Sequence, residues 1–125
     1  MQSRLPLTER VMKIGMQAIL LEDIECETVM EGADMCATIL TLRRGQQVPW
    51  HSHSMITDVM VCLEGVVVVE TSVPRLAHVL HPGERCTVAP MTAHCVHGQN
   101  EELCRFLIIQ GVGEYDNFAV SGQAD

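Results

Sequence analysis

A succession of short β-type runs, each closed by a turn signal, is the feature that most limits what this chain can fold into. Glu64-Gly65 separates two runs as in a tight hairpin, and His81-Pro82-Gly83 places Pro and Gly as in a type II turn. The pattern lacks helical periodicity and predicts an antiparallel all-β sandwich or barrel. The runs, rich in Val, Ile, Leu and Thr, cover residues 36–42, 58–63, 66–71, 76–80, 85–89, 94–97 and 105–110.

The length of 125 residues fits one domain with a single core. We expect this domain to span residues 1–125, with its strands concentrated in 36–110, an N-terminal lead-in over 1–35 and a C-terminal tail over 111–125. Apolar residues make up 47% of the chain and aromatic residues only 3%, so Val, Leu, Ile and Met must fill the core. Residues 8–20 are ambiguous, and Gly15 argues against a stable long helix there.

Charge and cysteine content exclude several classes of protein. The 16 acidic residues outnumber the 8 scattered Lys and Arg, so we expect no binding to nucleic acid or to anionic membranes. The chain begins without a secretion-signal pattern and has no run of about 20 apolar residues, so we expect a cytoplasmic protein. The six cysteines form no C-x-x-C pair, and we expect reduced thiols buried as small hydrophobic groups.

Two histidines, His51 and His53, are separated by a single residue in an extended segment. Side chains at i and i+2 of a strand point to the same face, so the two imidazoles would lie side by side, as a metal ion requires. A third nitrogen donor, His94, follows on a later run that can fold back against the first. Imidazole suits borderline metals, so the pattern predicts a divalent transition metal such as Fe, Mn, Ni, Cu, Co or Zn inside the β-structure.

The sequence around these histidines resembles the first motif of the small single-domain cupins, G-x5-H-x-H-x3,4-E-x6-G. Gly45 and Gly65 are its end glycines and every spacing fits, although Asp58 stands where the family has Glu. The resemblance implies that His51 and His53 are metal ligands together with this acid. Because Asp is one methylene shorter than Glu, Asp58 has three possible roles: direct ligation, holding a metal-bound water, or orienting a histidine from the second layer of contacts.

The second cupin motif, G-x5-P-x-G-x2-H-x3-N, is kept in spacing but altered in composition. Its spacing holds from Gly83 to His94, which the resemblance makes the third histidine ligand. The positions of Pro, Gly and Asn are taken by Ala89, Met91 and Gly98. Together the two motifs and their flanking strands cover roughly residues 36–110. The resemblance implies the cupin fold, a double-stranded β-helix or jelly-roll barrel.

Side chains alternate along a strand, so an inward direction for Asp58 and His94 also decides which of their neighbours face the site. We expect a pocket of aliphatic and sulfur-bearing side chains, namely Met60, Cys62, Val96, Phe106 and Ile108. Phe106, Ile108 and Gln110 share one face of their strand, and the alternation does not fix whether that face points inward. Side chains of opposite parity are expected to face away: Val59, Val61, Leu63, Cys95 and His97. We also expect the histidines that flank a turn, His78 and His81, to be exposed.

Small cupins include dioxygenases, lyases, isomerases and epimerases that act on small oxygen-rich molecules, so the resemblance implies a metal-dependent enzyme of this kind. A lyase or isomerase needs a proton acceptor, for which Asp58 is the candidate if it is not a ligand, with Tyr115 second. The alternatives are a non-catalytic cupin that binds a small molecule and a purely structural dimer. Small cupins often pair through an edge strand or exchange N-terminal segments, so we expect a homodimer, with Ile14 to Leu21 as a covering segment.

Overall fold

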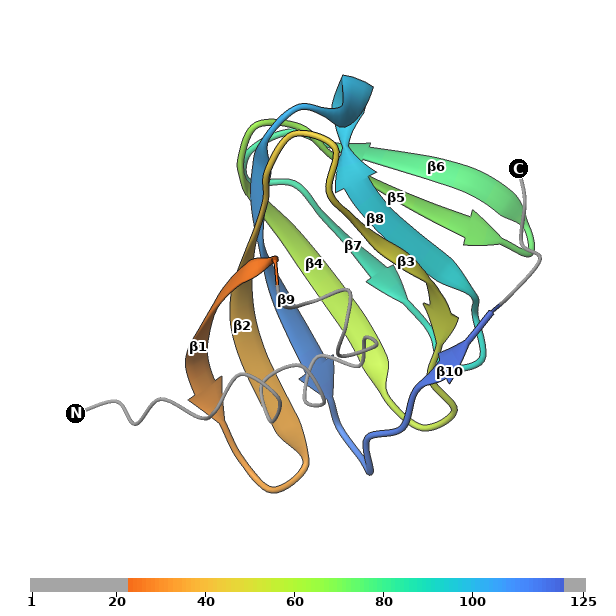
Figure 1. Cartoon of the computed structure of the whole chain (residues 1–125). Coiled ribbons are helices and arrows are strands. Elements are labelled where there is room, and N and C mark those ends of the chain that lie inside the picture. The colour runs from red at the N-terminus through yellow and green to blue at the C-terminus, as the bar shows by residue number, and fades with distance from the viewer. Residues whose placement is uncertain (1–22, 121–125) are drawn as a thin grey trace.

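The computed structural model describes residues 23–120, which form ten β-strands and one short 3-10 turn (Figure 1). The strands are β1 (Glu25–Glu31), β2 (Met35–Leu42), β3 (Gln47–Ser52), β4 (Thr57–Glu64), β5 (Val67–Ser72), β6 (Arg75–Leu80), β7 (Arg85–Val88), β8 (His94–Gly98), β9 (Cys104–Gly111) and β10 (Phe118–Ala119), and the turn η1 (Gln99–Glu101) follows β8. Among residues 23–120 there is no helix with the length and hydrophobicity needed to span a membrane. The ambiguous stretch 8–20 and the covering segment 14–21 lie outside the described residues.

The strands pair into two five-stranded antiparallel sheets that face each other (Figure 1). One sheet has the order β1-β2-β9-β4-β7 and the other the order β10-β3-β8-β5-β6. The chain crosses repeatedly between them, so that β3 and β4, which carry the first motif, lie in opposite sheets. The prediction of an all-β jelly-roll barrel is confirmed, and each predicted run corresponds to one strand.

Two strands lie where the sequence predicts no regular structure. β1 falls in the stretch assigned to the lead-in, and β10 in the stretch assigned to the tail. β1 is an edge strand whose sequence ECETVME is mostly charged or polar, and most of its side chains are exposed. β10 is only two residues long and pairs with β3 through Phe118 and Ala119. Neither segment has the apolar alternation by which a half-buried strand is recognised.

The core lies between the two sheets, and it is formed by every second side chain along the strands. In β9, the buried residues Cys104, Phe106, Ile108 and Gln110 alternate with half-buried ones. β4 buries Asp58, Met60 and Cys62 in the same way, while the exposed fraction of Leu63 is 39%. The predicted parity of these two strands is therefore confirmed. None of the six cysteines, all of which lie among the described residues, forms a disulfide, and all but the half-buried Cys86 lie buried, as expected.

The turn before β8 departs from the family pattern at a strained position. Met91 stands where the second cupin motif has Gly, and its φ is 69°, a left-handed conformation that glycine adopts without strain. Its amide donates a hydrogen bond to the carbonyl of His53, 2.6 Å away, which holds the turn beside the first motif. The backbone path of the motif is thus kept although the glycine is absent. The exposed fraction of Met91 is 75%, so its side chain adds little packing in return.

Replacing Met91 by glycine should therefore stabilise the protein. Met91→Gly relieves the left-handed strain but adds chain entropy to the unfolded state, and we expect the free energy of unfolding to rise by about 0.5–1 kcal/mol. Met55→Gly is the matched control, because Met55 is also exposed but has no positive φ. That control should lose about 0.5–1 kcal/mol. Urea denaturation measures both, and equal losses in the two variants would refute the interpretation.

Candidate metal centre

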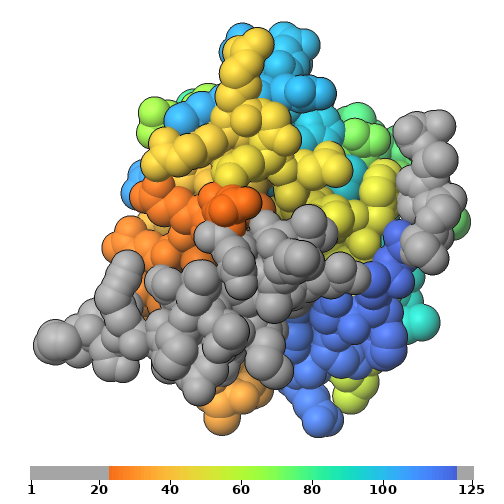
Figure 2. Space-filling model, viewed as in Figure 1, coloured from red at the N-terminus to blue at the C-terminus, as the bar shows by residue number. Residues whose placement is uncertain are grey.

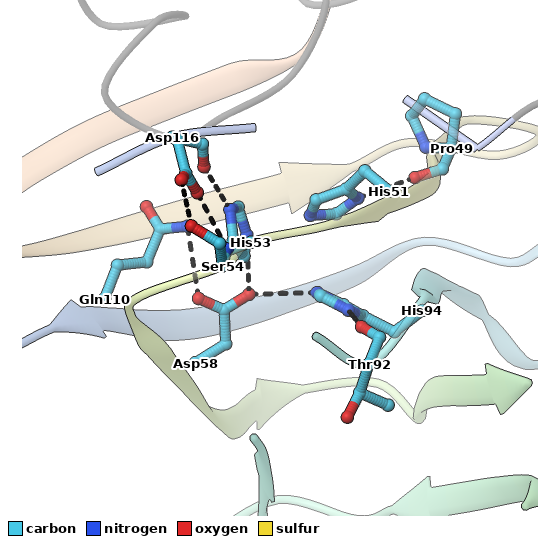
Figure 3. Close-up of polar contacts among 9 residues, drawn as sticks. All are labelled: Pro49, His51, His53, Ser54, Asp58, Thr92, His94, Gln110 and Asp116. Atoms are coloured by element: carbon cyan, nitrogen blue, oxygen red, sulfur yellow. Dashed lines mark hydrogen bonds and ion pairs between the residues drawn. The ribbon is translucent and has the colours of Figure 1, made fainter. Parts of the chain in front are cut away.

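Four polar side chains converge inside the barrel, and all of them are nearly inaccessible to solvent (Figure 3). His51 lies on β3 directly opposite His94, the first residue of β8, and His53 follows the end of β3. Asp58 reaches the same point from β4, in the opposite sheet. The exposed fractions of His51, His53, Asp58 and His94 are 4%, 2%, 1% and 1%. The structure thus brings together the three predicted histidines and the acid.

Each imidazole is held by a backbone carbonyl on the side away from the centre. Nδ1 of His51, His53 and His94 lies 2.8, 2.7 and 2.8 Å from the carbonyl oxygens of Pro49, Asp116 and Thr92, respectively (Figure 3). A carbonyl only accepts, so Nδ1 carries the hydrogen in all three rings. In a neutral ring, Nε2 then presents a lone pair toward the other ligands. This is the arrangement by which proteins orient metal-binding histidines.

The carboxylate of Asp58 faces these lone pairs at close range. Its Oδ2 lies 2.9 Å from Nε2 of His94 and 3.3 Å from Nε2 of His53. Its Oδ1 accepts a hydrogen bond of 3.3 Å from Nε2 of Gln110. Nε2 of His53 is buried and has no hydrogen-bond partner among residues 23–120. A lone pair facing a carboxylate is unfavourable unless a cation, either a proton or a metal, lies between them.

The spacing of these atoms fits a transition metal. Ligand atoms at about 2.1 Å from a metal lie about 3.0 Å apart at right angles and about 3.4 Å apart in a tetrahedron. The two distances from Asp58 to the histidines, 2.9 and 3.3 Å, are of this size. The ligand atoms of all four side chains lie within 4.8 Å of one another. This buried group could therefore hold a metal ion, and Asp58 reaches it although its side chain is shorter than Glu.

The protonation of the group follows from its burial and its internal charges. Burial, together with the neighbouring His94, lowers the pKa of His51 from 6.5 to about 3, so its ring stays neutral. Burial alone would raise the pKa of Asp58, but His53 and His94 outweigh it and hold that pKa below its usual range. Burial likewise opposes charge on His53, but the carboxylate of Asp58 outweighs it and raises the pKa of His53. The charge of Asp58 thus favours the protonated form of His53, which a metal ion would have to displace.

The segment after β9 contacts the buried group of His51, His53, Asp58 and His94. The backbone carbonyl of Asp116 accepts a hydrogen bond from Nδ1 of His53. Its carboxylate accepts hydrogen bonds from the amide and the hydroxyl of Ser54. β10 then pairs with β3 beside His51. In the space-filling view this segment (blue) forms part of the surface next to residues of the β3 region (yellow) (Figure 2). Sequence reasoning missed Asp116, because no motif marks the tail and the contact spans 63 residues.

Tyr115 lies beside the group, at the edge of a small cavity. Its ring centroid is 5.4 Å from that of His53, and its buried hydroxyl finds no hydrogen-bond partner in the described part of the chain. Burial raises the pKa of Tyr115, so the hydroxyl stays protonated and is suited to donate a hydrogen bond rather than to accept a proton. The cavity has a volume of about 40 Å³. Its lining residues are Ala33, Asp34, Met35, Cys36, Ile56, Gln110, Gly113 and Tyr115.

The five residues expected to line a pocket all belong to the buried core. Met60, Cys62, Val96, Phe106 and Ile108 face inward, and none of them lines the small cavity beside Tyr115. Their inward direction agrees with the expected alternation, and a ligand pocket along them stays a prediction. Of the histidines expected outside this buried group, His81 is exposed, His78 is half-buried rather than exposed, and His97 pairs with Glu70.

Comparison with known proteins supports the fold. No protein-family model and no curated protein matches the chain. A protein with a double-stranded β-helix domain from Klebsiella pneumoniae aligns at a TM-score of 0.66 and 18% identity, over 77% of this chain and 79% of its own. A cupin-2 domain protein from Shewanella frigidimarina aligns at a TM-score of 0.57 and 19% identity, and the alignment covers 68% of this chain and 78% of that protein. A cupin-like protein from Thermotoga maritima aligns at a TM-score of 0.63 and 14% identity, covering 78% of this chain and 79% of that protein. The chain therefore has the double-stranded β-helix fold of the cupins.

Metal binding to this group should strengthen as the pH rises. The pKa of His53 is raised above 6.5, so below that pKa a proton occupies the nitrogen that a metal needs. The association constant should rise by up to about tenfold per pH unit while His53 is protonated, and level off above its pKa. Calorimetric titration with Co²⁺ between about pH 6 and 8 measures this slope. An affinity that stays constant over the range would contradict the prediction.

Proposed function

We propose that this chain is a metal-dependent cupin enzyme that acts on a small oxygen-rich metabolite. The observation that carries the proposal is the convergence of three oriented imidazoles on one buried carboxylate, with only a proton or a metal able to lie between them. In the proposed centre, His51, His53, Asp58 and His94 are the ligands. Three nitrogen donors and one oxygen donor suit Fe, Mn, Co, Ni, Cu or Zn better than Ca²⁺ or Mg²⁺.

The residues around the centre favour chemistry that does not depend on a protein base. The metal, when bound, supplies Lewis acidity and positions open to substrate or dioxygen. Asp58, as a ligand held by Gln110, is not available as a general base. Tyr115 is protonated and would donate a hydrogen bond to a substrate oxygen. Among the cupin reactions, a dioxygenase needs no protein base, so we place it first and a lyase or isomerase second.

A non-catalytic metal site is the second candidate function, and the burial of the ligands favours it. Structural metal sites in proteins are closed, whereas catalytic ones keep a position open to solvent or substrate. The four ligands here are at most 4% exposed, and the adjoining cavity is small. In that case the metal would stabilise the barrel, alone or with a small bound molecule, without turnover.

Metal content tests the proposed ligands. In protein purified without added metal, we expect elemental analysis to find a transition metal in the wild type. His51→Ala and His94→Ala should each lower the bound metal at least about tenfold, because each removes a direct ligand. His81→Ala is the matched control: its side chain is 63% exposed and lies outside the group, so metal content should not change. Unchanged metal in both ligand variants would overturn the assignment.

The same proteins distinguish an enzyme from a structural site. Oxygen consumption is measured with a panel of diketones and thiols, and product formation with a panel of uronates and sugar isomers. An enzyme should turn over a member of one panel and lose turnover in His94→Ala, and Tyr115→Phe should keep its metal but lose activity. If no substrate reacts, yet chelation lowers the melting temperature, the metal is structural and the enzyme proposal fails.

We also propose that the chain forms a homodimer through strand β6. β6 is the outer strand of its sheet, and an uncovered edge strand offers unpaired backbone groups to a second copy. Its apolar side chains Leu76 and Val79 are 49% and 42% exposed, and Val73, just before the strand, is 82% exposed. A second molecule paired along this edge would cover all three.

Light scattering should therefore give about twice the chain mass of 13.8 kDa. Val79→Lys should shift the molar mass toward the monomer, because a lysine would have to be buried in the dimer. Val29→Lys is the control, since Val29 is 52% exposed on β1, at the edge of the other sheet, and its replacement should leave the dimer intact. A monomeric wild type would rule the dimer out.

A further inference from the structure

Strand β8 carries potential metal ligands on both of its faces. His94 and Val96 point into the barrel, so the residues of opposite parity, Cys95 and His97, belong to the outer face of the sheet. Glu70 on β5 is the direct cross-strand partner of Cys95. The antiparallel register therefore places a thiol, an imidazole and a carboxylate together outside the barrel, behind the wall that holds His94.

These three side chains form a compact group. Their ligand atoms lie within 4.8 Å of one another, and Nε2 of His97 is 2.6 Å from Oε2 of Glu70. Nδ1 of His97 lies 3.0 Å from the carbonyl oxygen of Gly98, which directs Nε2 toward the group as in the inner histidines. Cys95 is buried, at 3% exposed, whereas the side chains of His97 and Glu70 are 24% and 29% exposed. The group thus has a buried thiol, while its imidazole and carboxylate can be reached from solvent.

We propose that Cys95, His97 and Glu70 form a second metal site, for Zn²⁺ or a similar borderline ion. A thiolate, an imidazole and a carboxylate are the donors that zinc takes in proteins, and three protein ligands leave the fourth tetrahedral position to water or to a small ligand. None of these residues belongs to the inner group, and the inner group contains no sulfur. The proposal of a second site is therefore independent of the proposed function.

A bound ion requires one small movement. Nitrogen and oxygen ligands of a tetrahedral zinc lie about 3.3 Å apart, so the 2.6 Å contact between His97 and Glu70 must widen by about 0.7 Å. Both side chains are partly exposed and can rotate by this amount, while Cys95 stays fixed beneath them. The competing interpretation is a plain pair between His97 and Glu70 with no metal ion bound.

Cobalt titration of the full chain separates the two interpretations. Co²⁺ replaces Zn²⁺ in such sites, and a thiolate ligand gives it an intense charge-transfer absorption that nitrogen and oxygen ligands do not. We expect the wild type to bind two ions per chain and to show this band. Cys95→Ser should lose the band and one ion, and Glu70→Gln, which replaces a partly exposed side chain, should weaken that binding at least tenfold while the fold is kept.

Two controls assign the signal. Cys86→Ser alters a half-buried thiol that lies outside the group and should leave the band unchanged. His51→Ala should lose the inner ion but keep the band, so that failure of the inner site is distinguishable from failure of the outer one. A wild type without the band, or a band that persists in Cys95→Ser, would overturn the second site in favour of the plain pair.

Discussion

The buried carboxylate of Asp58 is the constraint around which the rest of the site is organised. A charge inside an apolar barrel is costly unless donors or cations surround it, and here two imidazoles and the amide of Gln110 do so. A hydrogen bond to a backbone carbonyl orients each imidazole toward the centre. The position of the acid in one sheet and of the histidines in the other means that the site exists only when the two sheets are packed together.

The parts of the fold that depend on side-chain alternation could be predicted from the sequence. The parity of β4 and β9 follows from which residues are apolar, and the spacing of the two motifs brings His51, His53 and His94 to one place. The all-β fold follows from the turn signals between short runs. In each of these cases the information lies in the identity of neighbouring side chains.

The remaining parts could not be predicted, because they depend on backbone groups or on distant contacts. The carbonyls that orient the imidazoles belong to Pro49, Thr92 and Asp116, and any residue type offers a carbonyl. β10 is too short to show a pattern, and its partner strand lies more than sixty residues earlier in the chain. The difference between a packed core and an open pocket depends on how side-chain volumes fill the barrel, which parity does not reveal.

The segment beside the buried group has a different origin from the group itself. The barrel strands supply the buried histidines and Asp58, whereas Tyr115 and Asp116 come from the short segment that follows β9. The carboxylate and the carbonyl of Asp116, together with the two-residue pairing of β10 with β3, hold this segment in place. Substitutions in that segment can alter the surroundings of the buried histidines while leaving the residues that build the barrel unchanged. The site and the barrel can thus vary separately in sequence, because the few residues after β9 shape the one and the strands build the other.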